Sequence, residues 1–126
     1  MKALVIDDSK AMRTIIGRIL KELNIEVCDA ADGSEGLSRL VEIPGIELVL
    51  VDWNMPVMNG LEFVQAVRGE ARWKDIRLMM VTTETEVEQM MRALEAGANE
   101  YVMKPFTKDI ILGKLQLMGL DTPTTA

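Results

Sequence analysis

The chain has 126 residues and a formal net charge of −6, and 48% of its residues are hydrophobic while only 4% are aromatic. This length suits one domain with a single buried core. The acidic balance argues against non-specific binding to nucleic acid or anionic membranes. Histidine is absent, which excludes Ser-His-Asp triads, histidine metal sites and a histidine phosphoryl carrier within the chain.

Cysteine content and hydropathy indicate the compartment. Cys28 is the single cysteine, so no internal disulfide is possible, and its apolar surroundings predict an inert core thiol. The N-terminal residues MKALVIDDSK contain no apolar stretch long enough for a signal peptide, and no window approaches the ~18 apolar residues of a membrane span. We therefore expect a soluble cytoplasmic protein with no membrane insertion.

Apolar strand-like runs alternate with helix-like segments five times along the chain. Capping-box spacing at Asp32/Glu35 and at Thr85/Glu88 marks two of the helix starts. The expected strands are 3–7, 25–30, 46–52, 76–82 and 100–103. The expected helices are 9–23, 32–43, 59–68, 85–97 and 107–118.

This (βα)5 alternation predicts an α/β fold in which a doubly wound parallel sheet is covered by helices on both faces. Right-handed crossovers leave few arrangements, and the flavodoxin-like strand order 2-1-3-4-5 is the commonest at this length. One domain is expected over residues 1–120, followed by a flexible tail at 121–126.

Acidic residues end two strands that this order makes neighbours. Asp7 and Asp8 close the first strand, and Asp52 closes the third. Their carboxylates would meet in the crevice where such folds bind ligands. Carboxylates that cannot separate repel one another, and a divalent cation such as Mg²⁺ or a lysine relieves the repulsion. Lys104, which ends the fifth strand, is the candidate lysine.

Such a site can carry phosphoryl chemistry. A carboxylate beside Mg²⁺ stays ionised and can attack phosphorus, which gives an aspartyl phosphate. Lys104 would offset charge on the phosphoryl oxygens, and Thr82 offers a hydroxyl from the end of the fourth strand. Each residue alone also suits an ordinary role, such as a helix cap for the acidic pair or a surface position for the lysine. Only their combination favours a site.

Four motifs resemble the receiver domains of two-component response regulators, and among these the single-domain chemotaxis regulators of the CheY type. They are D-D-S-K-A-M-R at 7–13, V-D-W-N-M-P-V-M-N-G at 51–60, V-T-T-E at 81–84 and Y-V-M-K-P-F-T at 101–107. The resemblance covers practically the whole chain. It implies phosphotransfer from the phosphohistidine of a histidine kinase, and output through contact with a downstream protein.

The resemblance also implies roles for individual residues. Asp52 matches the phosphoacceptor, and the Mg²⁺ ligands would be Asp7, Asp8, Asp52 and the backbone carbonyl of Asn54. Thr82 and Lys104 match residues that contact the phosphoryl group, and Tyr101 matches an aromatic whose rotation reports phosphorylation. The Lys104–Pro105 bond matches one that is cis in the family. Thr83 departs from the small residue common there and is expected to narrow access to the site.

The last helix has more apolar residues than one core stripe needs. Ile111, Leu115 and Met118 form the expected stripe, whereas Ile110 and Leu117 lie off it. Exposed apolar residues on one flank often mark a partner surface, although burial under a neighbouring helix would explain them equally well. In receivers this flank belongs to the output face formed by the fourth helix, fifth strand and fifth helix.

Two other functions stay open. The chain could be the receiver of a longer DNA-binding regulator, since a linker could begin where the tail does. It could also be a phosphatase of the haloacid-dehalogenase type, which uses an aspartyl phosphate, Mg²⁺, a threonine and a lysine. That family needs a general acid two residues after the nucleophile, where this chain has Asn54, and no segment is available as a cap domain.

Overall fold

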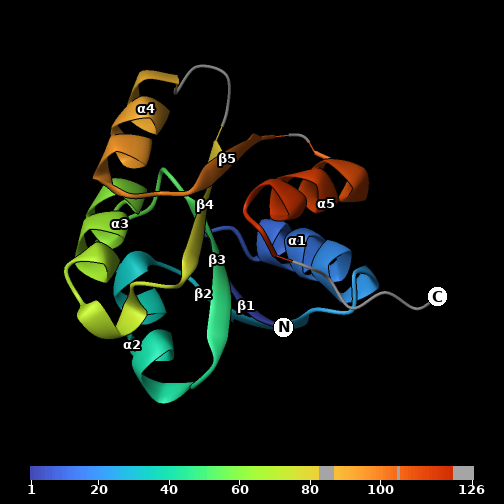
Figure 1. Ribbon diagram of the computed structural model, residues 1–126, viewed down its shortest axis with the longest axis horizontal. Helices are drawn as coiled ribbons and strands as arrows, with labels where there is room; N and C mark the ends of the chain where they lie inside the picture. The colour runs from blue at the N-terminus through green and yellow to red at the C-terminus, as the bar shows by residue number, and fades with distance from the viewer. Residues whose placement is uncertain (83–86, 105, 121–126) are drawn as a thin grey trace.

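The computed structural model describes residues 1–82, 87–104 and 106–120, which form one five-stranded parallel sheet with helices on both faces (Figure 1). The strands are β1 (Lys2–Ile6), β2 (Glu26–Ala30), β3 (Ile46–Asp52), β4 (Arg77–Thr82) and β5 (Glu100–Met103). The helices are α1 (Lys10–Glu22), α2 (Gly33–Glu42), α3 (Gly60–Arg68), the short 3₁₀ helix η1 (Ala71–Trp73), α4 (Val87–Ala96) and α5 (Lys108–Leu117).

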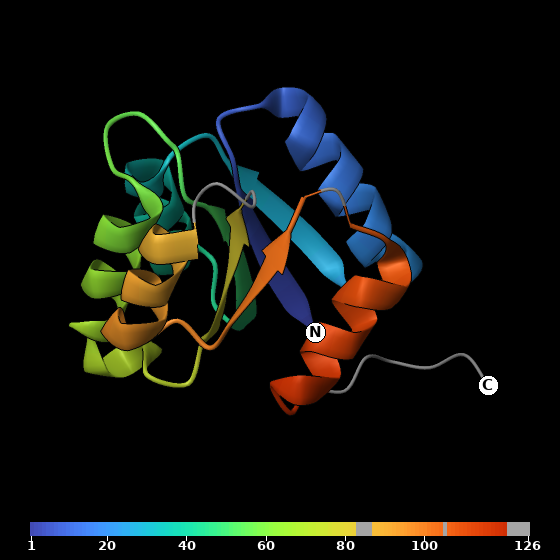
Figure 2. The same cartoon turned by 90° about the horizontal axis from the view of Figure 1, so that it is seen from above.

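The strand order is β2-β1-β3-β4-β5 and all pairs are parallel, so the predicted fold class is confirmed. Helices α1 and α5 cover one face of the sheet, and α2, α3 and α4 cover the other (Figure 2). The central strands are buried on both faces because alternate side chains enter the two cores. The predicted α5 stripe is confirmed: Ile111, Leu115 and Met118 are buried with α1 against the sheet.

Polar side chains cap several helix N-termini. The Ser9 hydroxyl accepts from the Met12 N–H at 3.2 Å, and Asn59 and Glu62 form a complete capping box on α3. At Asp32 only half of the expected box is present. The Asp32 carboxylate accepts from the Glu35 N–H at 2.8 Å, but the Glu35 carboxylate pairs with Arg39 one turn on, at 3.2 Å. The box expected at Thr85 lies outside the described residues.

Two further expectations concern burial and membranes. Cys28 is only partly buried, because β2 is an edge strand, so it is not the core thiol that we expected. Its thiol donates to the Ala3 carbonyl at 3.3 Å, and burial raises the pKa of the thiol, as an unreactive cysteine requires. Within the described ranges, the helices are too short and too polar to span a bilayer.

Gly60 allows α3 to start directly beneath the end of β3. Its N–H donates to the Trp53 carbonyl at 3.0 Å. A Cβ at this position would lie 2.9 Å from the carbonyl oxygen of Asp52 and 3.0 Å from Cα of Trp53. These neighbours are backbone atoms, so they cannot move aside without displacing the end of β3.

We predict that Gly60→Ala lowers the free energy of unfolding by about 1–3 kcal/mol, because overpacking forces the backbone apart. Gly113→Ala in α5 is the matched control, since its Cβ would meet nothing within 4 Å. This control should be neutral or stabilising by up to about 1 kcal/mol, as alanine is the better helix former. Urea denaturation measures both, and equal stability of the two variants would refute the close approach at Gly60.

Candidate functional site

The carboxyl ends of β1 and β3 bring three carboxylates together. Asp7 follows β1 directly, and Asp52 is the last residue of the neighbouring strand β3. Ligand oxygens from Asp7, Asp8 and Asp52 all lie within 4.8 Å of one another. Asp7 and Asp52 are 1% and 8% exposed, whereas Asp8 faces solvent. The convergence predicted from the strand order is therefore present, with two acids inside and one at the rim.

Lys104 enters this cluster from the far side of the sheet. Its backbone N–H donates to the Thr82 carbonyl at 2.8 Å, which continues the pairing of β5 with β4. Its Nζ lies 3.4 Å from Asp7 Oδ2 and 3.4 Å from Asp52 Oδ1. One ammonium thus bridges the two buried carboxylates, and the side chain has to span β4 to do so.

The position of Asp7 is fixed by two contacts from the start of α1. The Ser9 N–H donates to Asp7 Oδ1 at 2.9 Å. The Arg13 guanidinium donates to the Asp7 backbone carbonyl at 2.6 Å and pairs with Asp29 on β2 at 3.0 Å. We assigned no role to Arg13 from sequence. The available signal was its place at the end of the first turn of a helix that begins beside the acidic pair.

Burial and crowding change the acidity of Asp52. Desolvation raises its pKa, the Lys104 ammonium opposes this through its charge and hydrogen bond, and Asp7 and Asp8 raise it further. The result is a pKa of about 6, above the ordinary value of 3.8. Three carboxylates share one lysine, so the cluster has an excess of negative charge that a further cation would neutralise.

The donor set fits a hard divalent cation. All three side chains offer carboxylate oxygens, which Mg²⁺ prefers, and exposed Asp8 leaves room for the waters that Mg²⁺ retains. Asn54 lies in the exposed segment two residues after Asp52. Thr82 is buried at the end of β4, beside β3. Ligation by the Asn54 carbonyl and a phosphoryl contact from Thr82 stay predictions, and Thr83 and Pro105 lie outside the described residues.

Of the predicted switch and output residues, Thr82 is buried at the end of β4, and the other three lie on β5 and α5. Tyr101 on β5 is partly buried, and Lys114 Nζ lies 4.5 Å from the centre of its ring. Lys114 also forms an ion pair with Glu100 at 3.2 Å. Neither contact of Lys114 was predicted from the sequence. Ile110 and Leu117 are 45% and 74% exposed, so burial under a neighbouring helix is excluded as the reason for their apolar character.

The exposed apolar side chains of this region extend onto α4. Val87 and Met91 are exposed there, in addition to the two residues of α5. We call Val87, Met91, Tyr101, Ile110 and Leu117 the α4–β5–α5 face. Exposed apolar side chains of this kind are typical of protein-binding surfaces.

The sequence matches the family described as the response regulator receiver domain over residues 3–116. Among curated proteins, it is 42% identical over 119 residues to the chemotaxis protein CheY1 of Helicobacter pylori, covering 94% of this chain and 96% of that protein. It is 43% identical over 117 residues to the chemotaxis protein CheY homolog of Campylobacter jejuni, covering 92% and 90%. The solved structure of the chemotaxis response regulator CheY4 of Vibrio cholerae superimposes with a TM-score of 0.83 at 37% identity, covering 93% and 97%.

The raised pKa of Asp52 generates a prediction on stability. The folded state holds a proton on Asp52 up to about pH 6, whereas the unfolded chain releases it near 3.8, so wild-type stability falls as pH rises between these values. Asp52→Asn removes the buried charge. In metal-free buffer we expect this variant to be more stable than wild type at pH 7 by about 1–3 kcal/mol, and equally stable below about pH 4.

Denaturation in urea between pH 4 and 8, with a chelator present, measures this difference. Asp75→Asn removes an exposed carboxylate away from the cluster and should produce no such pH-dependent gain. An Asp52→Asn protein that is less stable than wild type at pH 7 would contradict the assigned cause.

Proposed function

The chain belongs to the family of response regulator receiver domains, and on this basis we propose that it is a phosphorylation-controlled binding module whose phosphoacceptor is Asp52. The observation that carries the proposal is the cluster in which Lys104 bridges Asp7 and Asp52 while Asp8 lies at the rim. The phosphodonor is the phosphohistidine of a sensor histidine kinase. The chain itself supplies no histidine, so the donor has to be another molecule.

In the proposed reaction an Asp52 carboxylate oxygen attacks phosphorus. A P–O bond forms as the P–N bond to the donor imidazole breaks, and the bonding electron pair returns to the imidazole nitrogen. Mg²⁺ bound by Asp7, Asp8, Asp52 and the Asn54 carbonyl would supply positive charge against the phosphoryl oxygens. Asp52 must be ionised to attack, and the Lys104 ammonium at 3.4 Å favours that state.

Lys104 and Thr82 have complementary roles in the product. The ammonium is already close to Asp52, so it can pair with a phosphoryl oxygen without a large movement. The Thr82 hydroxyl donates to another phosphoryl oxygen from the end of β4. A shift of Thr82 toward the phosphoryl group opens space beside Tyr101, and the ring position then changes the α4–β5–α5 face for a downstream protein.

The proposal places this switch in chemotaxis-type signalling, because the relatives reported above are named as chemotaxis proteins. Output is by protein contact, with no direct binding of nucleic acid, and the proposed location is the cytoplasm. A longer DNA-binding regulator is not favoured, since this chain spans 96% and 90% of the two curated relatives, which leaves them no room for a second domain. Slow hydrolysis of its own acyl phosphate is the expected catalytic activity, and it sets the lifetime of the signal.

A phosphatase of the haloacid-dehalogenase type is the rejected alternative. The family match argues against it, and Asn54 cannot act as the general acid that such a phosphatase needs. Turnover of many equivalents of p-nitrophenyl phosphate per protein molecule would restore this alternative.

Phosphotransfer from a ³²P-labelled histidine kinase tests the proposal directly. We expect Asp52→Asn to take up no label, because an amide cannot form an acyl phosphate in this way. Lys104→Gln should slow labelling by about 10²-fold, the usual effect of removing one donor to a developing anion. Asp75→Asn should label like wild type. Undiminished labelling of Asp52→Asn would end the proposal.

Two-dimensional NMR tests the output face separately. With Mg²⁺ and beryllium fluoride as a phosphoryl mimic, we expect amide shift changes that extend from Asp52 to Tyr101 and into α5. The Asp52→Asn protein under the same conditions is the control and should show none of them. Changes confined to the residues around Asp52 would contradict transmission to the α4–β5–α5 face.

A further inference from the structure

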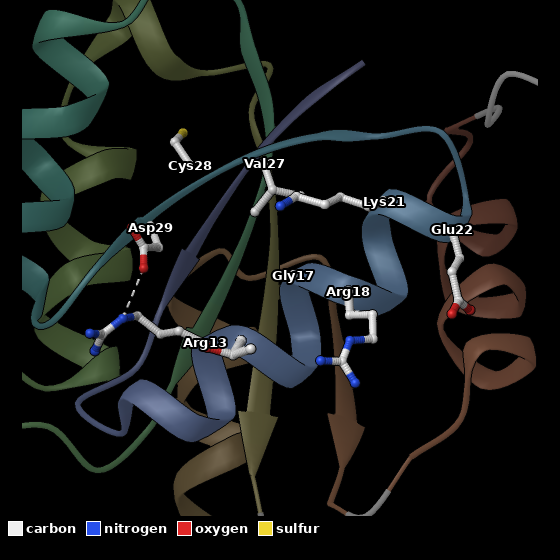
Figure 3. Close-up of a pocket in the computed structure, with 9 residues that line it drawn as sticks. Arg13, Gly17, Arg18, Lys21, Glu22, Val27, Cys28 and Asp29 are labelled. Carbon is white, nitrogen blue, oxygen red and sulfur yellow. Dashed lines mark hydrogen bonds and ion pairs between the residues drawn. The ribbon is translucent and has the colours of Figure 1, made fainter.

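A groove of about 610 Å³ lies between α1 and the edge strand β2 (Figure 3). Its wall on α1 includes Gly17, where a Cβ would be 3.7 Å from Val27 Cγ1 on β2. Because Gly17 has no side chain, this part of α1 leaves space open between the helix and β2. The groove lies outside the phosphorylation site and outside the α4–β5–α5 face, so neither proposed role accounts for it.

The groove is cationic although the whole chain is acidic. Its charged lining residues are Arg13, Arg18, Lys21, Glu22 and Asp29. Asp29 is neutralised by Arg13 at 3.0 Å, and Glu22 lies 3.8 Å from the Lys108 ammonium.

Among the charged residues that line the groove, Arg18 and Lys21 are therefore the two cations without a counter-charge. Within the part of the chain that the structure describes, neither forms an ion pair. They are three residues apart on α1 and share one face of the helix. Figure 3 shows Lys21 reaching across the groove toward Val27. Two unneutralised cations on one rim select an occupant with negative charge.

The other wall presents backbone groups of the edge strand β2 that do not pair with β1. The Glu26 N–H and the Ala30 carbonyl bond toward β1, so Val27 and Asp29, which alternate with them, direct their N–H and carbonyl groups away from the sheet. Arg39 donates to the outward Asp29 carbonyl at 3.2 Å. Cys28 lines the groove although its thiol bonds back to Ala3, which indicates that the β2 backbone itself borders the space.

From these two walls we propose that the groove binds an extended acidic segment of a partner protein. The segment lies beside β2 and pairs with the outward backbone groups of Val27, as in strand addition to a sheet edge. Its acidic side chains, on every second residue, face Arg18 and Lys21. The occupant is thus specified by backbone pairing on one side and charge complementarity on the other.

The test uses the full chain without phosphorylation and a six-residue peptide that alternates glutamate and valine, acetylated and amidated. In ¹⁵N NMR titrations at low salt we expect the amide shifts to centre on Gly17, Lys21 and Val27, and exchange of the Val27 N–H to slow. The double variant Arg18→Gln, Lys21→Gln should raise the Kd at least tenfold. The matched double variant Lys74→Gln, Arg92→Gln removes two exposed cations elsewhere and should bind like wild type.

Two altered peptides test the charge complementarity and the backbone pairing separately. Replacing glutamate by glutamine in the peptide, or methylating its alternate backbone nitrogens, should each weaken binding at least tenfold. The proposal is overturned if either altered peptide binds as tightly as the original, if the Arg18/Lys21 variant binds like wild type, or if the shifts centre on another face. It is also overturned if inorganic tripolyphosphate occupies the groove while the peptide does not.

Discussion

A shortage of positive charge at the carboxyl end of the sheet controls the chemistry of this protein. Two buried carboxylates, those of Asp7 and Asp52, share the single ammonium of Lys104, and Asp8 adds a third negative charge at the rim. Desolvation and this crowding raise the pKa of Asp52 to about 6. The same excess of negative charge that makes the site costly to keep ionised would favour binding of a divalent cation, which is what the proposed phosphorylation of Asp52 needs.

The strand order is what turns separate sequence positions into that cluster. Asp7 and Asp52 are 45 residues apart in number but end neighbouring strands, and Lys104 reaches them across β4. The apolar runs predicted the strands, and the right-handed crossover rule reduced their order to a few choices. Hence the convergence of the acids could be predicted from sequence, as could the α5 stripe, because both follow from periodicity and topology alone.

Contacts that depend on side-chain conformation between distant elements could not be predicted in this way. Arg13 is 16 residues from Asp29, and either could equally have pointed into solvent. The carboxylate of Glu35 pairs with Arg39 and does not cap the N-terminus of α2, and the spacing of the sequence allows either partner. Likewise, Lys114 lies over the Tyr101 ring only because α5 packs with that face toward β5. Periodicity specifies which face of a helix is buried, but it does not specify which polar partners meet at its border.

Arg13 contacts both the carboxylate cluster at the end of β1 and the groove between α1 and β2. Its guanidinium donates to the carbonyl of Asp7, inside the acidic cluster, and pairs with Asp29, at the border of the α1–β2 groove. Without this pairing Asp29 would add a negative charge beside Arg18 and Lys21, and the groove would be less cationic. Without the contact to Asp7 the turn that leads into α1 would hold the carboxylate less firmly. One side chain therefore contacts both sites: its Nη1 donates to the backbone beside the acidic cluster, and its Nε pairs with the carboxylate at the border of the groove.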